Sequence, residues 1–359
     1  MKNFNVKTLI LAACATAFTA CSKDDNDKPT PIEVLTSYGV FVVNAGNTYN
    51  MINGSLDYID LEKNTITNNV FEKVNGRALG VNANDAFAYG IKLYIAVDGE
   101  QMVEVVDTKT LESLAQIKLE GNARHLTAWD GKMYATAFNG EVCRIDTTTL
   151  EVDKVVAVGS YPEGMTVTNS VMLVANSGYG EGHTLSVIDL VNFKESKTIE
   201  CPTNPVSFAN DGRNIYLLCS GKYAADWTYE ENPAVYKYDA NIGNFTKMFD
   251  ATAFCNNGEY IYAFDSNYYK PEVTYPKYGL QTGVTSVMDL SGDIIIPCAI
   301  AADPITKHLW VSSYNLGDSG YADYNAPGYI VEFDENGKKL HAYNTGVCPI
   351  AICFYNNLK

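Results

Sequence analysis

Residues 161–200 hold four short β-type runs, and this arrangement restricts the fold more than any other stretch of the chain. The runs are MTVT, VMLVAN, TLSVID and KESKTIE, joined by an Asn169-Ser170 turn, a glycine-rich loop and the segment LVNF. Connections this short join antiparallel neighbours. Four antiparallel strands in about forty residues form one blade of a β-propeller, so the stretch predicts a repeat architecture.

An apolar residue followed by Asp recurs where the third strand of each unit ends. Successive pairs are 39 to 50 residues apart, except for a last interval of 95 residues that has room for two units. Met288-Asp289 falls in that interval, but it lies too close to the next first strand to be the missing pair. The spacing predicts seven units, one of them degenerate. The pairs are Ile59-Asp60, Val106-Asp107, Ile145-Asp146, Ile188-Asp189, Tyr238-Asp239 and Phe333-Asp334.

These aspartates are expected to be structural, because a carboxylate at a strand end can accept backbone N–H groups of the following turn. The second strands are nearly continuous apolar runs, as expected for strands buried on both faces.

The two ends of the repeat region complement each other. Cys348 to Tyr355 looks like a first strand after which the chain ends, whereas the first unit begins with a second strand at Gly39 to Val43. Pairing these segments would complete blade one and remove the free edges of the ring. The sequence therefore predicts an all-β, seven-bladed β-propeller over residues 38–359, closed by the C-terminal strand.

Residues 1–20 are expected to be a secretory signal peptide. Lys2 and Lys7 precede the apolar run Thr8 to Ala17, which is too short to span a bilayer. Phe18-Thr19-Ala20-Cys21 resembles the lipobox of bacterial lipoproteins, in which the cysteine is lipidated; an ordinary signal peptide cut nearby is the alternative. Residues 21–37 would then be the lipidated cysteine and a flexible tether.

The acidic run after Cys21, from Ser22 to Asp27, resembles the export tag of surface-exposed lipoproteins in gut Gram-negative anaerobes. This resemblance implies a lipid-anchored protein of the outer membrane that faces the cell exterior. A solvated linker facing the periplasm is the alternative.

Charge and motif content narrow the function classes. A net charge of −16 argues against nucleic-acid partners, which are polyanions. The four histidines, at 125, 183, 308 and 341, lie in different units without carboxylate neighbours at metal-ligand spacing, and catalytic sequence motifs are lacking. We therefore expect a protein that is not an enzyme and has no cofactor or metal. A calcium ion at Asp318 and Asp323 is left open, as is one disulfide among the seven cysteines that follow Cys21.

One face of the predicted ring is expected to bind a ligand. Loops between second and third strands are long in five units, at residues 44–54, 177–183, 220–233, 266–283 and 313–328. They are rich in aromatic residues, which give rigid contact area at low entropy cost; mutual packing of the rings is the alternative. Trp227 is the first choice for a central contact. The predicted contacts are Tyr49, Tyr179, Tyr223, Trp227, Tyr229, Tyr268, Tyr269, Tyr275, Tyr278, Tyr314, Tyr321 and Tyr324, with Arg124, Tyr161 and Asn204 at the starts of first strands.

The segments PEGMTV, LVANSG and LSVIDL resemble the repeat of bacterial YncE-like and surface-layer β-propellers. Residues 42–47, 75–80, 161–165 and 218–221 further resemble the propellers with which gut anaerobes capture cobalamin at the cell surface. That resemblance implies capture of cobalamin or another corrinoid, and its transfer to an outer-membrane TonB-dependent transporter. The alternatives are a glycan-binding or protein-binding propeller and, third, a propeller lyase or oxidoreductase.

Overall fold

The computed structural model describes residues 34–357, apart from residue 227 and residues 267–271. The chain divides into Met1–Val34 and a second unit, Leu35–Lys359, and the description below concerns the second unit. The predicted signal peptide, Cys21 and nearly all of the predicted tether lie outside the described residues.

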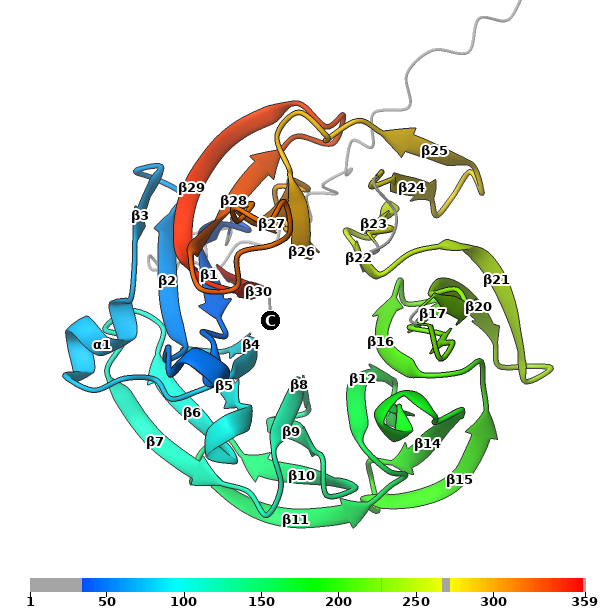
Figure 1. Ribbon diagram of the computed structural model, residues 1–359. Helices are drawn as coiled ribbons and strands as arrows, with labels where there is room; N and C mark the ends of the chain where they lie inside the picture. Colours follow the sequence, from blue (N-terminus) through cyan, green and yellow to red (C-terminus); the bar gives the residue numbers. More distant parts are fainter. Residues whose placement is uncertain (1–33, 227, 267–271, 358–359) are drawn as a thin grey trace, which may run out of the picture. The chain divides into compact units, whose positions relative to one another are not determined.

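Within the described residues, seven four-stranded antiparallel sheets are arranged around a common axis (Figure 1). The seven-bladed β-propeller predicted from the repeats is therefore confirmed. Blade 1 contains β30 (Pro349–Asn356), β1 (Ser37–Asn44), β2 (Ser55–Asp60) and β3 (Thr65–Thr67). Blade 2 contains β4 (Ala83–Tyr89), β5 (Lys92–Val97), β6 (Met102–Asp107) and β7 (Ser113–Lys118). Blade 3 contains β8 (Ala123–Trp129), β9 (Lys132–Ala137), β10 (Glu141–Asp146) and β11 (Glu151–Ala157).

The other blades follow the same order from the inner to the outer strand. Blade 4 contains β12 (Pro162–Thr168), β13 (Val171–Asn176), β14 (Thr184–Asp189) and β15 (Lys194–Glu200). Blade 5 contains β16 (Pro205–Asn210), β17 (Ile215–Cys219), β20 (Ala234–Asp239) and β21 (Asn244–Asp250), with an added hairpin of β18 (Lys222–Tyr223) and β19 (Tyr229–Glu231). Blade 6 contains β22 (Ala253–Asn256), β23 (Tyr260–Phe264), β24 (Tyr275–Gly279) and β25 (Thr285–Met288). Blade 7 contains β26 (Ile296–Ala302), β27 (Leu309–Tyr314), β28 (Pro327–Phe333) and β29 (Lys339–Val347).

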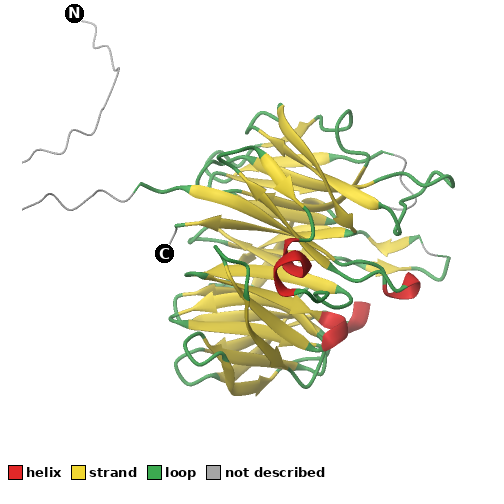
Figure 2. Cartoon of the chain, turned by 90° about the vertical axis from the view of Figure 1, so that its left-hand side faces the viewer, coloured by secondary structure: helices red, strands yellow, loops and turns green. Residues whose placement is uncertain are grey.

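The short helical segments lie in loops on one face of the ring. They are η1 (Thr48–Asn50), α1 (Val70–Asn75), η2 (Asp98–Glu100) and η3 (Gly178–Gly180). We call this the loop face, formed by connections from second to third strands and from each blade to the next. Figure 2 shows the helices on that side of the strand layers, whereas β30 ends toward the other side. Ser37 pairs with Asn356, so β1 begins beside the end of β30 on the opposite face.

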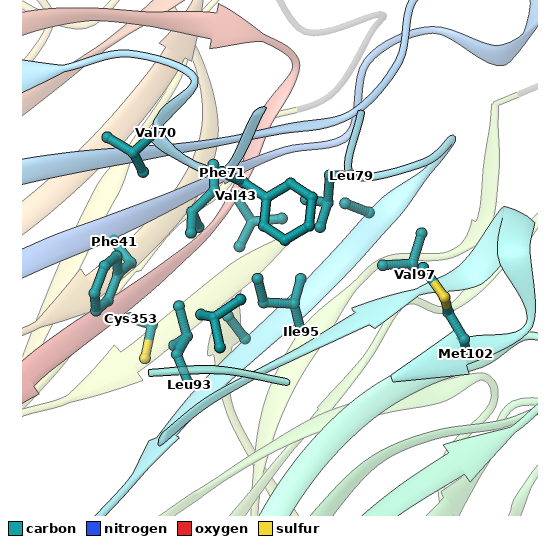
Figure 3. Close-up of a cluster of buried hydrophobic side chains, with 14 residues drawn as sticks. Phe41, Val43, Val70, Phe71, Leu79, Leu93, Ile95, Val97, Met102 and Cys353 are labelled. Carbon is teal, nitrogen blue, oxygen red and sulfur yellow. The ribbon is translucent and has the colours of Figure 1, made fainter. Parts of the chain in front are cut away.

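The C-terminal strand closes the ring as predicted. β30 pairs with β1 in the register Val40↔Phe354 and Val42↔Ile352. Cys353 of β30 also joins the buried cluster between blades 1 and 2, where Phe41 of β1 packs with Leu93 of β5 (Figure 3). The last strand of the chain is thus both an inner strand and part of the apolar core.

The aspartates at the ends of third strands are structural, as predicted. Asp60 accepts the backbone N–H groups of Glu62 and Lys63 at 3.1 and 3.0 Å, and Asp107 does the same for Lys109 and Thr110 at 2.8 Å each. The hydrogen bonds with Thr110 and Lys109 lower the pKa of Asp107, because they favour the charged carboxylate.

One predicted loop contains a whole strand of a blade. The third strand of the degenerate unit, β24, lies inside residues 266–283, and it ends at Gly279 rather than at an Asp. Pro276 made this run look unlike a strand, since proline is depleted in strands. Here Pro276 is tolerated opposite Val287 of β25.

Candidate aromatic site on the loop face

β-bulges near the starts of the inner strands aim polar side chains at the centre of the loop face. The pairing of β8 with β9 shifts between Ala123 and Leu126, so Arg124 and His125 lie in a bulge. The pairing of β12 with β13 shifts between Pro162 and Met165, which places Glu163 in the next blade's bulge. Because a bulge changes the direction of its side chains, these residues of neighbouring blades can meet.

Two exposed tyrosines are held in the left-handed backbone conformation. Tyr161, directly before β12, has φ 49°, and Tyr179 in η3 has φ 58°. Asn82 and Asn204, directly before β4 and β16, have φ 55° and 59°, and asparagine tolerates this region well. At the corresponding position of blade 4 the residue is Tyr161, and a bulky residue rarely adopts this backbone conformation. Such strained residues are common at functional sites.

Tyr161 is the middle ring of an aromatic row, which we call the aromatic ladder and define as Phe138, Tyr161 and Tyr179. The rings of Phe138 and Tyr161 are 5.3 Å apart in an edge-on arrangement, and those of Tyr161 and Tyr179 are 5.2 Å apart. Tyr161 is 40% exposed and Tyr179 is 77% exposed. Asn204 lies beside this row, because its backbone N–H donates to the carbonyl of Gly182, 2.6 Å away.

Arg124 fixes the inner end of the ladder. Its guanidinium carbon lies 4.4 Å from the centre of the Phe138 ring. It donates to both carboxylate oxygens of Glu163 at 3.1 and 3.2 Å, and to Asn84 and Asp98 at 2.8 and 3.2 Å. The side chain is only 19% exposed. Arg124 therefore positions Phe138, with most of its N–H groups already bonded within the protein.

His125 connects Glu163 to a third blade. Its Nδ1 lies 3.4 Å from Oδ2 of Asp85 and its Nε2 lies 3.3 Å from Oε2 of Glu163. Burial disfavours the charged imidazolium, but the hydrogen bonds to Asp85 and Glu163 outweigh burial and raise the pKa of His125 to about 9. Burial acts to raise the pKa of Glu163, but His125 and Arg124 lower it overall. Blades 2, 3 and 4 are thus tied together by charge beneath the ladder.

The expectation that the four histidines lie in different units is wrong, because His308 and His341 both belong to blade 7. The expectation that they lack carboxylate neighbours holds along the sequence but is wrong in the folded structure. His183 lies 3.5 Å from Glu200, and His308 and His341 both contact Glu332. Strand pairing and blade packing bring these partners together, although most of them are far apart in sequence. Among the described residues, no group of three or more His, Cys, Asp or Glu side chains is arranged to hold a metal ion.

The other predicted aromatic residues form separate groups on the loop face. Tyr223 and Tyr229 of the added hairpin stack at 4.5 Å, with their hydroxyl oxygens 2.8 Å apart. Tyr314 and Tyr324 pack at 5.0 Å in blade 7. Tyr321 is 51% exposed and Tyr49 is 98% exposed. Several rings therefore pack in pairs, and only part of the predicted set meets in one place.

Three predicted contacts belong to strands of the blades, and one of them, Tyr314, is the last residue of β27. Tyr275 and Tyr278 belong to β24, where Tyr275 is 2% exposed and packs in the core between blades 6 and 7. Tyr278 is partly buried against the cluster between blades 5 and 6. Their placement on a ligand-binding loop was wrong because a strand was read as loop. Trp227, Tyr268 and Tyr269 lie outside the described residues.

Phe138 was missed by sequence reasoning. The loop that follows it, Asn139-Gly140, is short, and attention went to long loops. The available signal was an aromatic residue directly after the second strand β9, where it faces the start of the next blade's inner strand.

The described cavities open elsewhere. Three cavities, of about 440, 470 and 640 Å³, are lined by residues near the turns of the opposite face.

The cysteines at 143, 201, 219, 255, 298, 348 and 353 are free thiols. No helix of the described chain has both the length and the apolar character needed to cross a membrane.

Comparison with known proteins identifies the family. The model of a family described as a domain of unknown function (DUF5074) matches residues 38–348. The chain belongs to the DUF5074 family. No curated protein matches this DUF5074 chain.

A solved structure titled Kuenenia stuttgartiensis hydrazine synthase is similar to the DUF5074 propeller. It has 14% sequence identity and a TM-score of 0.60, and the match covers 76% of this chain and 89% of that one. At such low identity the similarity concerns the fold alone. A propeller is compatible with a binding protein, and the similar structure belongs to an enzyme, so the fold does not assign either class.

Proposed function

We propose that this protein captures a solute on the aromatic ladder of the loop face. The observation that carries the proposal is the pair of exposed tyrosines, Tyr161 and Tyr179, whose rings are held together by left-handed backbone conformations. Such conformations cost about 1–2 kcal/mol for a non-glycine residue, so the rings stay in place at the expense of stability. Rings fixed before a ligand arrives lose little entropy on binding.

The solute is a broad molecule with apolar faces and polar edges, and a corrinoid such as cobalamin is the first candidate. Tyrosine offers a ring face for an apolar surface and a hydroxyl for amide groups. The resemblance of residues 161–165 to cobalamin-capturing propellers supports the same choice, since this segment contains both Tyr161 and Glu163.

The protein acts, in this proposal, as a lipoprotein anchored through Cys21 to the outer membrane and facing the cell exterior. β1 begins on the face opposite the ladder. A chain attached at that face leaves the loop face free to collect solute and to pass it to an outer-membrane TonB-dependent transporter.

Isothermal titration calorimetry with cyanocobalamin and a panel of oligosaccharides tests the capture. We expect cyanocobalamin to bind with one site, and Tyr179→Ala to weaken binding by more than tenfold, about 1.4 kcal/mol. Tyr38→Ala is the matched control, because Tyr38 is 43% exposed, packs on one ring at 5.2 Å as Tyr179 does, and lies on the opposite face. If an oligosaccharide binds and cyanocobalamin does not, the ligand is a glycan and not a corrinoid. Equal binding by wild type and Tyr179→Ala would remove the ladder from the site.

A protein partner is the second candidate, and one observation favours it. The described cavities open on the opposite face, whereas the loop face presents exposed rings such as Tyr49, Tyr179 and Tyr321. Exposed tyrosines are typical of protein interfaces. This alternative would be established if no small solute binds in the calorimetry, whereas a purified transporter does bind and Tyr179→Ala weakens that binding.

A further inference from the structure

A second candidate site lies on the opposite face, between blades 1 and 7. The cavity there has a volume of about 640 Å³, within the range of small-molecule sites. It is lined by the start of β1, the end of β2 and the turn to β3, the turn before β27, and the parts of β28 and β29 nearest that face. It shares no residue with the aromatic ladder, so it is independent of the function proposed above.

One wall of the cavity is a row of three side chains from adjacent strands. Glu332 of β28 is 5% exposed and lies directly opposite His341 of β29. Its two carboxylate oxygens contact Nδ1 of His308 at 2.7 Å and Nδ1 of His341 at 2.8 Å. Since a carboxylate only accepts, each Nδ1 carries the proton and donates it. Among the described residues neither Nε2 atom has a hydrogen-bond partner, so both nitrogens are available to a ligand.

A buried negative charge lies behind the same cavity. Asp303 is fully buried, and its Oδ2 has no hydrogen-bond partner among the described residues. Its Oδ1 accepts the hydroxyl of Ser37 at 2.8 Å and the backbone N–H of Thr306 at 3.3 Å, and both of these residues line the cavity. A buried carboxylate is costly without a compensating positive charge, so this region attracts cations.

The charged residues that line the cavity are also negative. The lining contains the carboxylates of Asp60, Glu62 and Glu332, and no lysine or arginine among the lining residues that the structure describes. Lys63, which does not line the cavity, forms an ion pair with Asp60 and offsets its charge. Glu62 is exposed and supplies a negative charge at the mouth of the cavity. Tyr38 and Tyr58 supply aromatic rings, which attract ammonium groups through their faces.

We propose that the cavity between blades 1 and 7 binds an organic cation with ammonium N–H groups. Its positive charge would lie near Glu62 and the field of Asp303, and its N–H groups would donate to the free imidazole nitrogens of His308 and His341. An anion is excluded by the same charges, and the tyrosine rings favour a carbon-containing cation over a bare ion.

Titration calorimetry at 0.15 M salt with spermidine as the probe tests this proposal, with triethylene glycol as a neutral chain of similar length. We expect one equivalent of spermidine to bind and triethylene glycol not to bind. Thr306→Trp should abolish binding by filling the cavity, and folding should be little affected because Thr306 is exposed. Glu62→Gln should weaken binding about fivefold, as expected for one charge a few ångströms away in water.

Glu151→Gln is the matched control, because it removes the same charge from an exposed position on blade 3. Its affinity for spermidine should equal that of the wild type. An equal loss in Glu62→Gln and Glu151→Gln would mean general attraction to an acidic protein and would overturn the proposal. Absence of spermidine binding, or unchanged binding by Thr306→Trp, would overturn it as well.

Discussion

Replacing Tyr161 by asparagine separates recognition from packing at the aromatic ladder. Asparagine occupies the corresponding left-handed positions before β4 and β16, at Asn82 and Asn204. The substitution therefore keeps the backbone conformation that blade 4 requires while it removes the middle ring of the ladder. Tyr161 contacts Phe138 at 5.3 Å and Tyr179 at 5.2 Å, so one change breaks both ring contacts.

The expected change in the free energy of unfolding is small, because two effects oppose each other. Two aromatic contacts contribute about 0.5–1.5 kcal/mol each, toward the lower value for a ring that is 40% exposed. Relief of the left-handed strain returns about 1 kcal/mol, since asparagine adopts this conformation more easily than tyrosine. The sum is within about 1 kcal/mol of zero, which for a domain of this size shifts Tm by less than about 4 °C.

Ligand binding should respond much more strongly than stability. Removing the central ring of a recognition site costs about 2 kcal/mol or more, which is roughly a 30-fold increase in Kd. Thermal melts and calorimetry with cyanocobalamin measure the two effects side by side. Tyr161→Phe is the control: it keeps the ring and the strain, and should bind within a few-fold of the wild type. A Tm that falls by more than about 5 °C in Tyr161→Asn would show that the ring is structural packing. Unchanged affinity would refute the ladder as the binding site.

Three further predictions concern closure, anchoring and pH. Deleting residues 347–359 removes β30 and takes Cys353 out of the core between blades 1 and 2, so the cooperative thermal transition should be lost; melting like the full chain would show that closure does not depend on β30. Cys21→Ala should move the protein from the membrane to the soluble fraction, because two acyl chains are needed for stable anchoring, and unchanged fractionation would contradict lipidation. The folded-state pKa of His125, raised to about 9, lies above its ordinary value near 6.5, so its stabilisation is full below about pH 6.5 and is lost as pH rises through 9. Melts at pH 6.5 and 9.5 should show this loss in the wild type and not in His125→Gln; the same loss in both proteins would assign it to other groups.

The features that could be predicted from the sequence depend on residues that are close together along the chain. Apolar runs bounded by turns predicted the second strands, and the aspartates at strand ends predicted their own hydrogen bonds, since donor and acceptor are two or three residues apart. Ring closure was also readable, because a lone first strand at Cys348 to Tyr355 complements a unit that lacks one. The gathering of tyrosines in long loops indicated the face that carries the ladder. This local reading placed three tyrosines in loops that lie in strands: Tyr275 and Tyr278, where Pro276 made β24 look unlike a strand, and Tyr314 at the end of β27.

The contacts that make the two candidate sites were decided by tertiary structure. Arg124 and Glu163 lie in blades 3 and 4, and they meet because the inner strands of these two blades both carry a bulge at the loop face. Tyr161 joins Phe138 and Tyr179 through a left-handed backbone that no residue pattern announces. The cavity between blades 1 and 7 exists because the two ends of the repeat region are packed against each other. In each case the partners are too far apart in sequence for local propensity to register, and only the packing of blades around a closed ring brings them within hydrogen-bonding or ring-contact distance.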